Sequence, residues 1–418
     1  MLRSSLPALT PGRRILAGVA CFIVAILVAV LLWGARTVDG TPVSADISLS
    51  DLDFGEFGAE TLTEPRNDKE RYSRLIESAR MSEAVADPRE IDASLSPRMP
   101  ALLPRPADTT GILADVASPI LAKYGMLGGY SVVGCPPANC PTYNRPWSLR
   151  ITALRLPDDA AARGAATEIE AADFAVSPEN VAVTLPDYPA AQGHWRPTVP
   201  TLGITLAHGP FVVTIFVTFP NPDLGELSRL AAKAVSVELP TLDRFAPTPV
   251  ADLPGLRFDR DDMLRRMVPT TRGAWSYPYI TKLQPDTTAG EGYYIEASGV
   301  VFGPTGAAHA LPGAAETAGI PADAIERVAL IDRNWLIRVR DAPSARRLAA
   351  EESAYGRNQT PMADPAVPDT KCLRQEGILP VYYCVVQDGR YVAVVNATDE
   401  KSVHQRAAAQ YALLVRNR

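Results

Sequence analysis

Apolar residues form one unbroken run near the start of the chain, whereas later they mix with polar residues. The run Ile15 to Trp33 (ILAGVACFIVAILVAVLLW) contains no charged residue and no proline. As a helix at ~1.5 Å per residue it would be about 28 Å long, close to the ~30 Å hydrocarbon core of a bilayer. Arg3, Arg13 and Arg14 precede it without an acidic residue, which predicts residues 1–14 in the cytoplasm and everything after Trp33 outside. We therefore predict a single-pass signal anchor that ties the protein to the cytoplasmic membrane through residues 15–33.

Two other interpretations of this run stay open. A cleaved signal peptide usually has an apolar stretch of ~7–15 residues, and the small-residue site Val43-Ser44-Ala45 lies far beyond the run. A lipoprotein signal would use Cys21, but 12 further apolar residues follow that cysteine and no leucine stands three positions before it. Cys21 fits better as a small apolar side chain inside a helix.

After a tether at residues 34–46, the patterns predict an α+β protein in two halves. Three prolines within Pro247–Pro254 interrupt regular structure, so we place a first extracytoplasmic domain at residues 47–246 and a second at residues 255–418. Each half shows the order strand, helix, hairpin, helix. The elements are 147–156, 158–174, 202–219 and 224–237 in the first half, and 335–340, 342–354, 381–395 and 399–415 in the second.

The shared order predicts two related modules of antiparallel sheet with helices packed on one face. Short local matches support the repeat. Gly209 and Gly389 both precede a hairpin strand, and an arginine stands two positions before both Trp147 and Trp335. We expect Trp147 to lie at the position equivalent to Trp335.

Composition and charge remove one class of function. The 418 residues include 41 basic and 47 acidic side chains, a net charge of −6. A protein dedicated to nucleic-acid binding normally carries a basic field, so no nucleic-acid partner is expected.

The cysteines beyond Cys21 form two close pairs, Cys135 with Cys140 and Cys372 with Cys384. An even number outside the cytoplasm predicts disulfides, and local pairing is favoured because each pair falls within one half of the chain. A zinc site built from the four cysteines is the rival interpretation, but their spacing differs from that of zinc ribbons and knuckles.

No compact catalytic motif is present. The chain has no G-x-S-x-G, no dinucleotide-binding or P-loop pattern, and no histidine pair at metal-ligand spacing. We therefore predict no catalytic residue, cofactor or metal, and favour a non-enzymatic binding or assembly protein. The alternative is an extracytoplasmic hydrolase whose dispersed site would join a serine and a carboxylate to a histidine in one pocket. The four histidines are His194, His208, His309 and His404.

Two clusters remain as candidate sites. Asp259, Asp261 and Asp262 suit the N-terminus of a helix better than a calcium loop, which would need a glycine and a later glutamate. Aromatic residues beside proline and glycine suit recognition of a glycan or peptide, although they can also close over the second core. These possible ligand contacts are Trp275, Tyr277, Tyr279, Tyr293 and Tyr294.

Several short motifs together resemble a known family. They are Leu52 to Gly55 (LDFG), Ser78 to Glu83 (SARMSE), Asp87 to Asp92 (DPREID), Phe302 to Ala308 (FGPTGAA), Arg390 to Val392 (RYV) and Gln405 to Ala412 (QRAAAQYA). The chain resembles uncharacterised two-domain envelope lipoproteins of mycolic-acid-bearing actinobacteria, over about residues 47 to 418.

The resemblance implies an extracytoplasmic protein attached to the cell envelope, with an unidentified envelope protein, lipid or glycan as its partner. It brings no established activity, cofactor or catalytic residue. The chain departs from the family at its start, because those relatives use a lipidated cysteine where this sequence has a transmembrane helix.

Overall fold

The computed structural model describes residues 48–136, 147–280, 297–354, 356, 358–377 and 380–418. The predicted membrane anchor and tether, Cys140, Tyr293 and Tyr294 lie outside these residues. No helix within the described residues is both long and apolar enough to cross a membrane.

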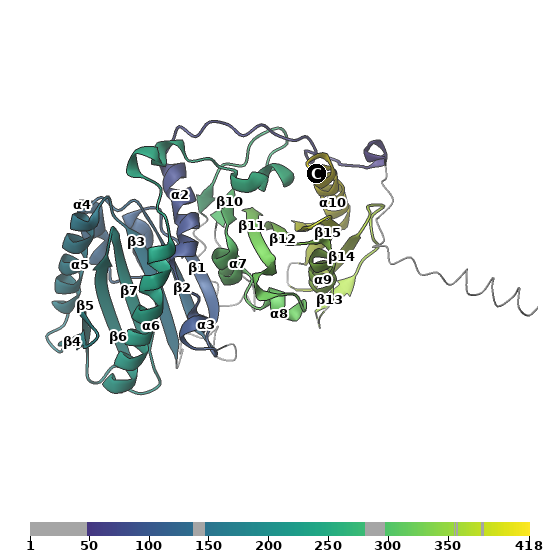
Figure 1. Cartoon of the computed structure of the whole chain (residues 1–418). Coiled ribbons are helices and arrows are strands. Elements are labelled where there is room, and N and C mark those ends of the chain that lie inside the picture. Colours follow the sequence, from purple (N-terminus) through teal and green to yellow (C-terminus); the bar gives the residue numbers. More distant parts are fainter. Residues whose placement is uncertain (1–47, 137–146, 281–296, 355, 357, 378–379) are drawn as a thin grey trace, which may run out of the picture. The chain divides into compact units, whose positions relative to one another are not determined.

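Two seven-stranded sheets have the same topology (Figure 1). The strand order is β1-β2-β3-β7-β6-β5-β4 in the first sheet and β10-β11-β12-β16-β15-β14-β13 in the second, and every pair is antiparallel. The first sheet comprises β1 (Ser96–Leu102), β2 (Gly128–Cys135), β3 (Ser148–Arg155), β4 (Val181–Leu185), β5 (Tyr188–Trp195), β6 (Thr201–His208) and β7 (Phe211–Thr218). The second comprises β10 (Val300–Phe302), β11 (Ile325–Ile331), β12 (Asn334–Val339), β13 (Gln359–Pro361), β14 (Thr370–Gln375), β15 (Val381–Asp388) and β16 (Tyr391–Ala397). The predicted pair of related α+β modules is confirmed.

The helices follow the same repeat. The described α-helices are α2 (Glu70–Arg80), α3 (Pro88–Ile91), α4 (Ala117–Lys123), α5 (Asp159–Phe174), α6 (Leu224–Arg244), α7 (Pro304–Ala310), α8 (Ala314–Thr317), α9 (Ala342–Glu352) and α10 (Glu400–Arg416). Helix α5 corresponds to α9 and α6 to α10. Each of these four begins after an aspartate whose carboxylate accepts a backbone N–H of the first turn: Asp158, Asp223, Asp341 and Asp399. Such a cap contributes about 1 kcal/mol.

Helices cover both faces of each sheet, so the prediction of helices on one face was wrong. Ala153 packs in the cluster that contains α6, whereas its neighbour Leu154 packs in the cluster that contains α5. Successive residues of a strand point to opposite faces, so the two helices lie on opposite sides of the sheet. Strand β7 (FVVTIFVT) is largely buried for the same reason.

The strand register corrects one detail of the predicted repeat. Phe211, which starts β7, pairs with Arg155, and Tyr391, which starts β16, pairs with Arg338. If Arg155 and Arg338 are equivalent, the residues three positions before them, Thr152 and Trp335, are equivalent as well. Trp147 lies five positions before Thr152. The match of Trp147 with Trp335 was therefore wrong. Trp147 lies eight residues before Arg155, whereas Trp335 lies three residues before Arg338.

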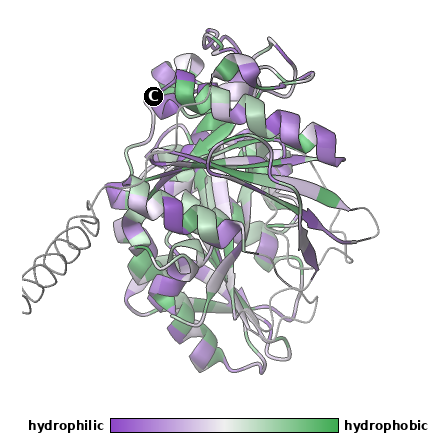
Figure 2. Ribbon diagram, turned by 90° about the vertical axis from the view of Figure 1, so that its right-hand side faces the viewer, coloured by the Kyte–Doolittle hydropathy of each residue, from purple (hydrophilic) through white to green (hydrophobic). Residues whose placement is uncertain are grey.

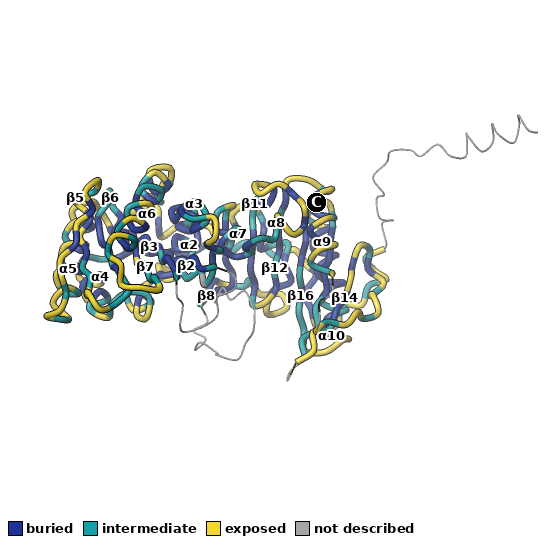
Figure 3. The backbone as a smooth tube through the Cα atoms, turned by 90° about the horizontal axis from the view of Figure 1, so that it is seen from below, coloured by how far each residue is buried: buried dark blue, intermediate teal, exposed yellow. Residues whose placement is uncertain are grey.

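The two modules share one hydrophobic core. A single cluster of buried residues includes Ile151 and Val213 of the first sheet and Ile337 and Val392 of the second. Helix α2 packs against both β2 and β10 (Figure 1), and buried residues continue through α2, β2 and α7 (Figure 3). The helices carry both hydrophilic and hydrophobic residues (Figure 2). Residues 46–418 accordingly form one compact unit.

The N-terminal segment, residues 48–64, contacts the second module although the sequence places it in the first domain. Phe57 and Ala59 pack with Ala409 and Leu413 of α10. The Arg416 guanidinium donates to the carbonyl oxygen of Ala59. The N-terminal segment therefore packs on the second module, although it precedes the first module in the sequence.

Candidate functional site

Four aromatic rings from distant segments form a cluster, which we call the aromatic cluster: Tyr72, Phe258, Trp275 and Tyr277. Tyr277 stacks on Tyr72 with ring centroids 5.2 Å apart and an interplanar angle of 14°. Phe258 stands edge-on to both tyrosines, with centroid distances of 5.6 Å and 5.4 Å. Trp275 lies 6.4 Å from Phe258. Edge and offset contacts are the favoured arrangements of aromatic rings, so the cluster holds its own geometry.

The backbone beside the cluster is held by a glycine. Gly299, between the short strands β9 (Ala297–Ser298) and β10, has φ +67°. A Cβ there would lie 2.8 Å from the carbonyl oxygen of Ser276 and 2.9 Å from Pro278. Only a residue without a side chain allows the segment that carries Tyr277 to come so close.

Two tyrosines of this segment face solvent. Tyr277 is 43% exposed and Tyr279 is 44% exposed. Tyr279, in the short strand β8 (Tyr279–Ile280), donates its hydroxyl to Asp332. The other carboxylate oxygen of Asp332 accepts a hydrogen bond of 3.0 Å from the Thr270 hydroxyl. Burial, together with the Asp332 hydrogen bond, raises the pKa of Tyr279 above its ordinary value.

Basic side chains flank the cluster at the start of α2. The Arg71 guanidinium lies 4.7 Å from the Tyr72 ring centroid, and its Nη2 donates to the Tyr72 hydroxyl at 2.9 Å. The Lys69 ammonium lies 6.0 Å from the same centroid. The aromatic cluster therefore has hydrogen-bond donors beside Tyr72, and the acceptor Asp332 lies on the neighbouring Tyr279.

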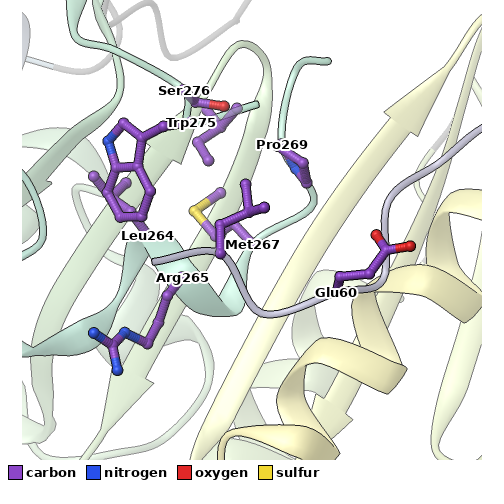
Figure 4. Close-up of a pocket in the computed structure, with 9 residues that line it drawn as sticks. Glu60, Leu264, Arg265, Met267, Pro269, Trp275 and Ser276 are labelled. Carbon is purple, nitrogen blue, oxygen red and sulfur yellow. The ribbon is translucent and has the colours of Figure 1, made fainter. Parts of the chain in front are cut away.

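Trp275 also lines a small cavity with Leu264, Met267 and Ile331 (Figure 4). The cavity holds about 10 Å³, which is the room one water molecule needs. The indole Nε1 is buried and finds no hydrogen-bond partner among the described residues. Trp275 packs against the second core, so its ring supports the cluster from within.

The acidic residues before the cavity cap a helical turn. The Asp259 carboxylate accepts the backbone N–H of Leu264 at 2.6 Å and that of Arg265 at 3.0 Å, at the start of the 3-10 turn Leu264–Arg266. Burial raises the pKa of Asp259 to about 6. The expectation of acids at a helix start is confirmed for Asp259, whereas Asp261 pairs with Arg327 at 2.7 Å.

Three histidines have carboxylate or phenol partners. His194 Nδ1 lies 2.8 Å from Glu170 Oε1, and this hydrogen bond raises the pKa of His194. His208 Nε2 lies 2.6 Å from Asp243 Oδ1. His309 Nδ1 lies 3.2 Å from the Tyr130 hydroxyl across the contact of the two modules. Within the part of the chain that the structure describes, no histidine is hydrogen-bonded to a serine.

The disulfide between Cys372 and Cys384 is present, as predicted. Cys135 is also disulfide-bonded. Its predicted partner Cys140 lies outside the described residues, so that pairing stays a prediction.

Comparison with known proteins gives the family. The N-terminal part of DUF7373, a domain of unknown function, matches residues 64–258, and its C-terminal part matches residues 263–417. The chain belongs to the DUF7373 family. The first DUF7373 part ends at residue 258 and the second begins at residue 263.

Similarity to individual proteins is weak. No protein of curated function matches the DUF7373 chain significantly. Among solved structures, the extracellular domain of PknH from Mycobacterium tuberculosis is similar at 16% sequence identity and a TM-score of 0.26. The match covers 43% of this chain and 98% of that domain.

Sequence reasoning found half of the aromatic cluster. It singled out Trp275 and Tyr277 because they stand beside proline and glycine in one short segment. It missed Tyr72 and Phe258. The available signal was Tyr72 itself, an aromatic in line with Ile76 and Ala79 on the apolar face of its helix.

Proposed function

We propose that this DUF7373 protein is a membrane-tethered, extracytoplasmic protein of the cell envelope that binds a glycan through the aromatic cluster. One observation carries the proposal: the Tyr277 ring is stacked on Tyr72 and is nevertheless 43% exposed. A ring that is already fixed loses little conformational freedom when a ligand packs on it, and this preorganisation favours binding.

The surroundings of Tyr277 suit sugars. An aromatic face packs on the apolar face of a pyranose or furanose ring, while hydroxyl groups need donors and acceptors at its edge. Asp332 and the Thr270 hydroxyl lie beside Tyr279, and Arg71 lies beside Tyr72. Hydrogen bonds to charged groups are the stronger ones, so Asp332 and Arg71 would orient the ligand.

The location is argued from the sequence and the disulfide. The apolar run at residues 15–33 and the arginines before it favour a single pass with the N-terminus inside. Disulfides persist in oxidising compartments, and Cys372–Cys384 is consistent with a bulk outside the cytoplasmic membrane.

Binding is favoured over catalysis because the histidine partners found are Glu170, Asp243 and Tyr130. A hydrolase of the serine type would need a histidine between a carboxylate and a serine. His194 and His208 have the carboxylate, but neither is hydrogen-bonded to a serine in the described residues.

Calorimetric titration of the full chain in detergent with wall polysaccharide from the source cells tests this function. Tyr277→Ala should weaken binding about tenfold, which corresponds to about 1.4 kcal/mol. Phe216→Ala is the matched control, because Phe216 is equally exposed, at 43%, and lies on β7 of the first sheet. Equal loss in both variants, no binding by the wild type, or hydrolysis of the polysaccharide would contradict the proposal.

A further inference from the structure

Helix α10 places a histidine against the disulfide of the second module. Cys372 on β14 and Cys384 on β15 are directly opposed in the strand register. One ligand atom from each cysteine and one from His404 all lie within 4.8 Å of one another. Helix α10 rests on the sulfurs, since Cys384 Sγ lies 3.9 Å from the carbonyl oxygen of Val403.

His404 has an unused nitrogen at this point. Its Nε2 is buried and has no hydrogen-bond partner in the described part of the chain. Buried polar atoms in native proteins almost always have a partner, so an orphaned one indicates a bound water, an ion or a redox role. Cys372 is 2% exposed and Cys384 is fully buried, so the two sulfurs lie in an enclosed corner beside His404.

The three ligand atoms suit a metal that prefers sulfur and nitrogen. Zinc binds thiolate at about 2.3 Å and imidazole at about 2.0 Å, so neighbouring ligand atoms of a tetrahedral site lie about 3.3–3.8 Å apart. Atoms that already lie within 4.8 Å of one another reach this spacing by small side-chain movements. The sulfurs become ligands only after the disulfide is reduced.

A groove open to solvent lies beside His404. It has a volume of about 600 Å³ and is lined by His404 together with Asp51, Asp53, residues 365–367, Glu400, Lys401, Gln405 and Ala408. Three of its lining residues are acidic and one is a lysine, which favours entry of a cation. A water or ligand in the groove would complete the coordination beside His404, because many zinc sites use three protein ligands and one open position.

We propose that Cys372, Cys384 and His404 form a redox-gated site for a thiophilic metal ion, with Zn²⁺ as its representative. A dithiol reductant transfers two electrons and two protons to the Cys372–Cys384 bond and becomes a disulfide itself. The two thiols then lose their protons to solvent as Sγ of each cysteine and Nε2 of His404 bind the ion. In the oxidised protein the same residues hold no metal, because both sulfurs are bonded to each other.

Cobalt absorption tests the site on the full chain in detergent. The protein is reduced with a phosphine, freed of reductant without oxygen and titrated with Co²⁺. The reduced wild type should bind one Co²⁺ with thiolate-to-cobalt charge-transfer bands and tetrahedral d–d bands, both abolished by added Zn²⁺. The oxidised protein should show neither set of bands.

Variants assign the ligands. Cys372→Ser with Cys384→Ser should remove the charge-transfer bands, and His404→Ala should weaken Co²⁺ binding at least about tenfold. His208→Ala is the control. His208 pairs with Asp243 at 2.6 Å and lies on β6 of the first sheet, whereas both cysteines lie on the second sheet. Reduced wild type without thiolate bands, or a His404→Ala variant with wild-type affinity, overturns the proposal.

A second measurement needs no variant and so does not depend on variant folding. Reduced wild-type protein is alkylated with iodoacetamide with and without Zn²⁺, and the modified cysteines are mapped by mass spectrometry. Zn²⁺ should protect Cys372 and Cys384 but not Cys135. Equal labelling of Cys372 and Cys384 in both samples rejects the site.

Discussion

Arg155 and Arg338 occupy the same position in the two sheets, and each is paired with a carboxylate. Arg155 on β3 is 3% exposed and bonds Glu77 of α2, whereas Arg338 on β12 lies 3.1 Å from Glu326, whose side chain is 31% exposed. Glu77 also accepts hydrogen bonds from the Thr248 backbone N–H at 3.1 Å and the Thr248 hydroxyl at 2.7 Å. In the first module this repeated arginine thus helps to hold the segment that leads to the second module.

The Arg155–Glu77 pair predicts an unequal effect of two matched substitutions. Glu77→Ala leaves the Arg155 charge buried without its partner and should cost about 3–5 kcal/mol of unfolding free energy. Glu326→Ala removes the equivalent partner of Arg338 in a partly exposed pair and should cost less, about 1 kcal/mol. Urea unfolding of both variants measures the difference. Equal losses would show that the two arginines are equivalent in energy as well as in position.

Glu238 predicts a loss of stability in alkali. Its side chain on α6 is fully buried, and burial raises its pKa to about 8 although the Ala86 N–H donates to it. A carboxyl whose pKa is raised on folding favours the folded state below its unfolded pKa of about 4.5, and this contribution is lost as the pH rises to about 8. Glu238→Gln should therefore gain on the wild type by about 1.4 kcal/mol per pH unit across that window. The unfolding free energy of both proteins is measured at pH 5 and pH 8. An equal change between the two pH values in wild type and variant would refute the assignment.

His309 predicts the opposite behaviour in acid. Complete burial lowers its pKa to about 4 from an ordinary value of 6.5, so the folded protein holds it neutral. The unfolded chain binds the proton first, and stability is lost as the pH falls from 6.5 towards 4. His309→Gln should lose less stability over this range than the wild type. Since His309 meets Tyr130 of the first module, hydrogen exchange in α7 should also rise in acid in the wild type and not in the variant.

Gly299 predicts a link between backbone space and ligand binding. Gly299→Ala would push its Cβ into Ser276 and Pro278, shift Tyr277 and destabilise the protein by about 1–3 kcal/mol. Gly319→Ala is the control, because Gly319 has a similar φ of +62° and no atom within 4 Å of the added Cβ. Both variants carry the cost of a positive φ, and only Gly299→Ala should also weaken polysaccharide binding. Full binding by Gly299→Ala would separate the backbone contact from the aromatic cluster.

Peptide mapping under non-reducing conditions checks the remaining cysteines. We expect a peptide that joins Cys135 to Cys140, since Cys372 and Cys384 already bond each other. A link from Cys135 to Cys21 would contradict the local pairing and would also challenge the predicted membrane helix.

The sequence predicted those features that local rules determine. Helix starts at Asp158 and Asp341 follow from aspartate capping, and the hairpins follow from glycines that adopt positive φ at 209 and 389. These signals gave the order of elements and the repeat.

Features that depend on tertiary packing were not predictable in this way. Strand β7 reads as a continuous apolar run, which cannot show whether one or two layers of helices cover it. Tyr72 and Phe258 make their edge-on contact only because α2 of one module reaches the start of the other. The apolar residues of the N-terminal segment follow no regular helical or strand period, so nothing local indicates that it packs on α10.

The N-terminal segment gives the protein an order of assembly and a path for force. Gln405 on α10 donates to Asp53, 352 residues earlier, at 2.7 Å. During synthesis the N-terminal segment cannot make this contact until α10 has been synthesised, so this part of the fold closes late. Tension applied at the start of the described chain would act first on the contact between the N-terminal segment and α10. The force would reach the first module only after this segment had detached from that helix.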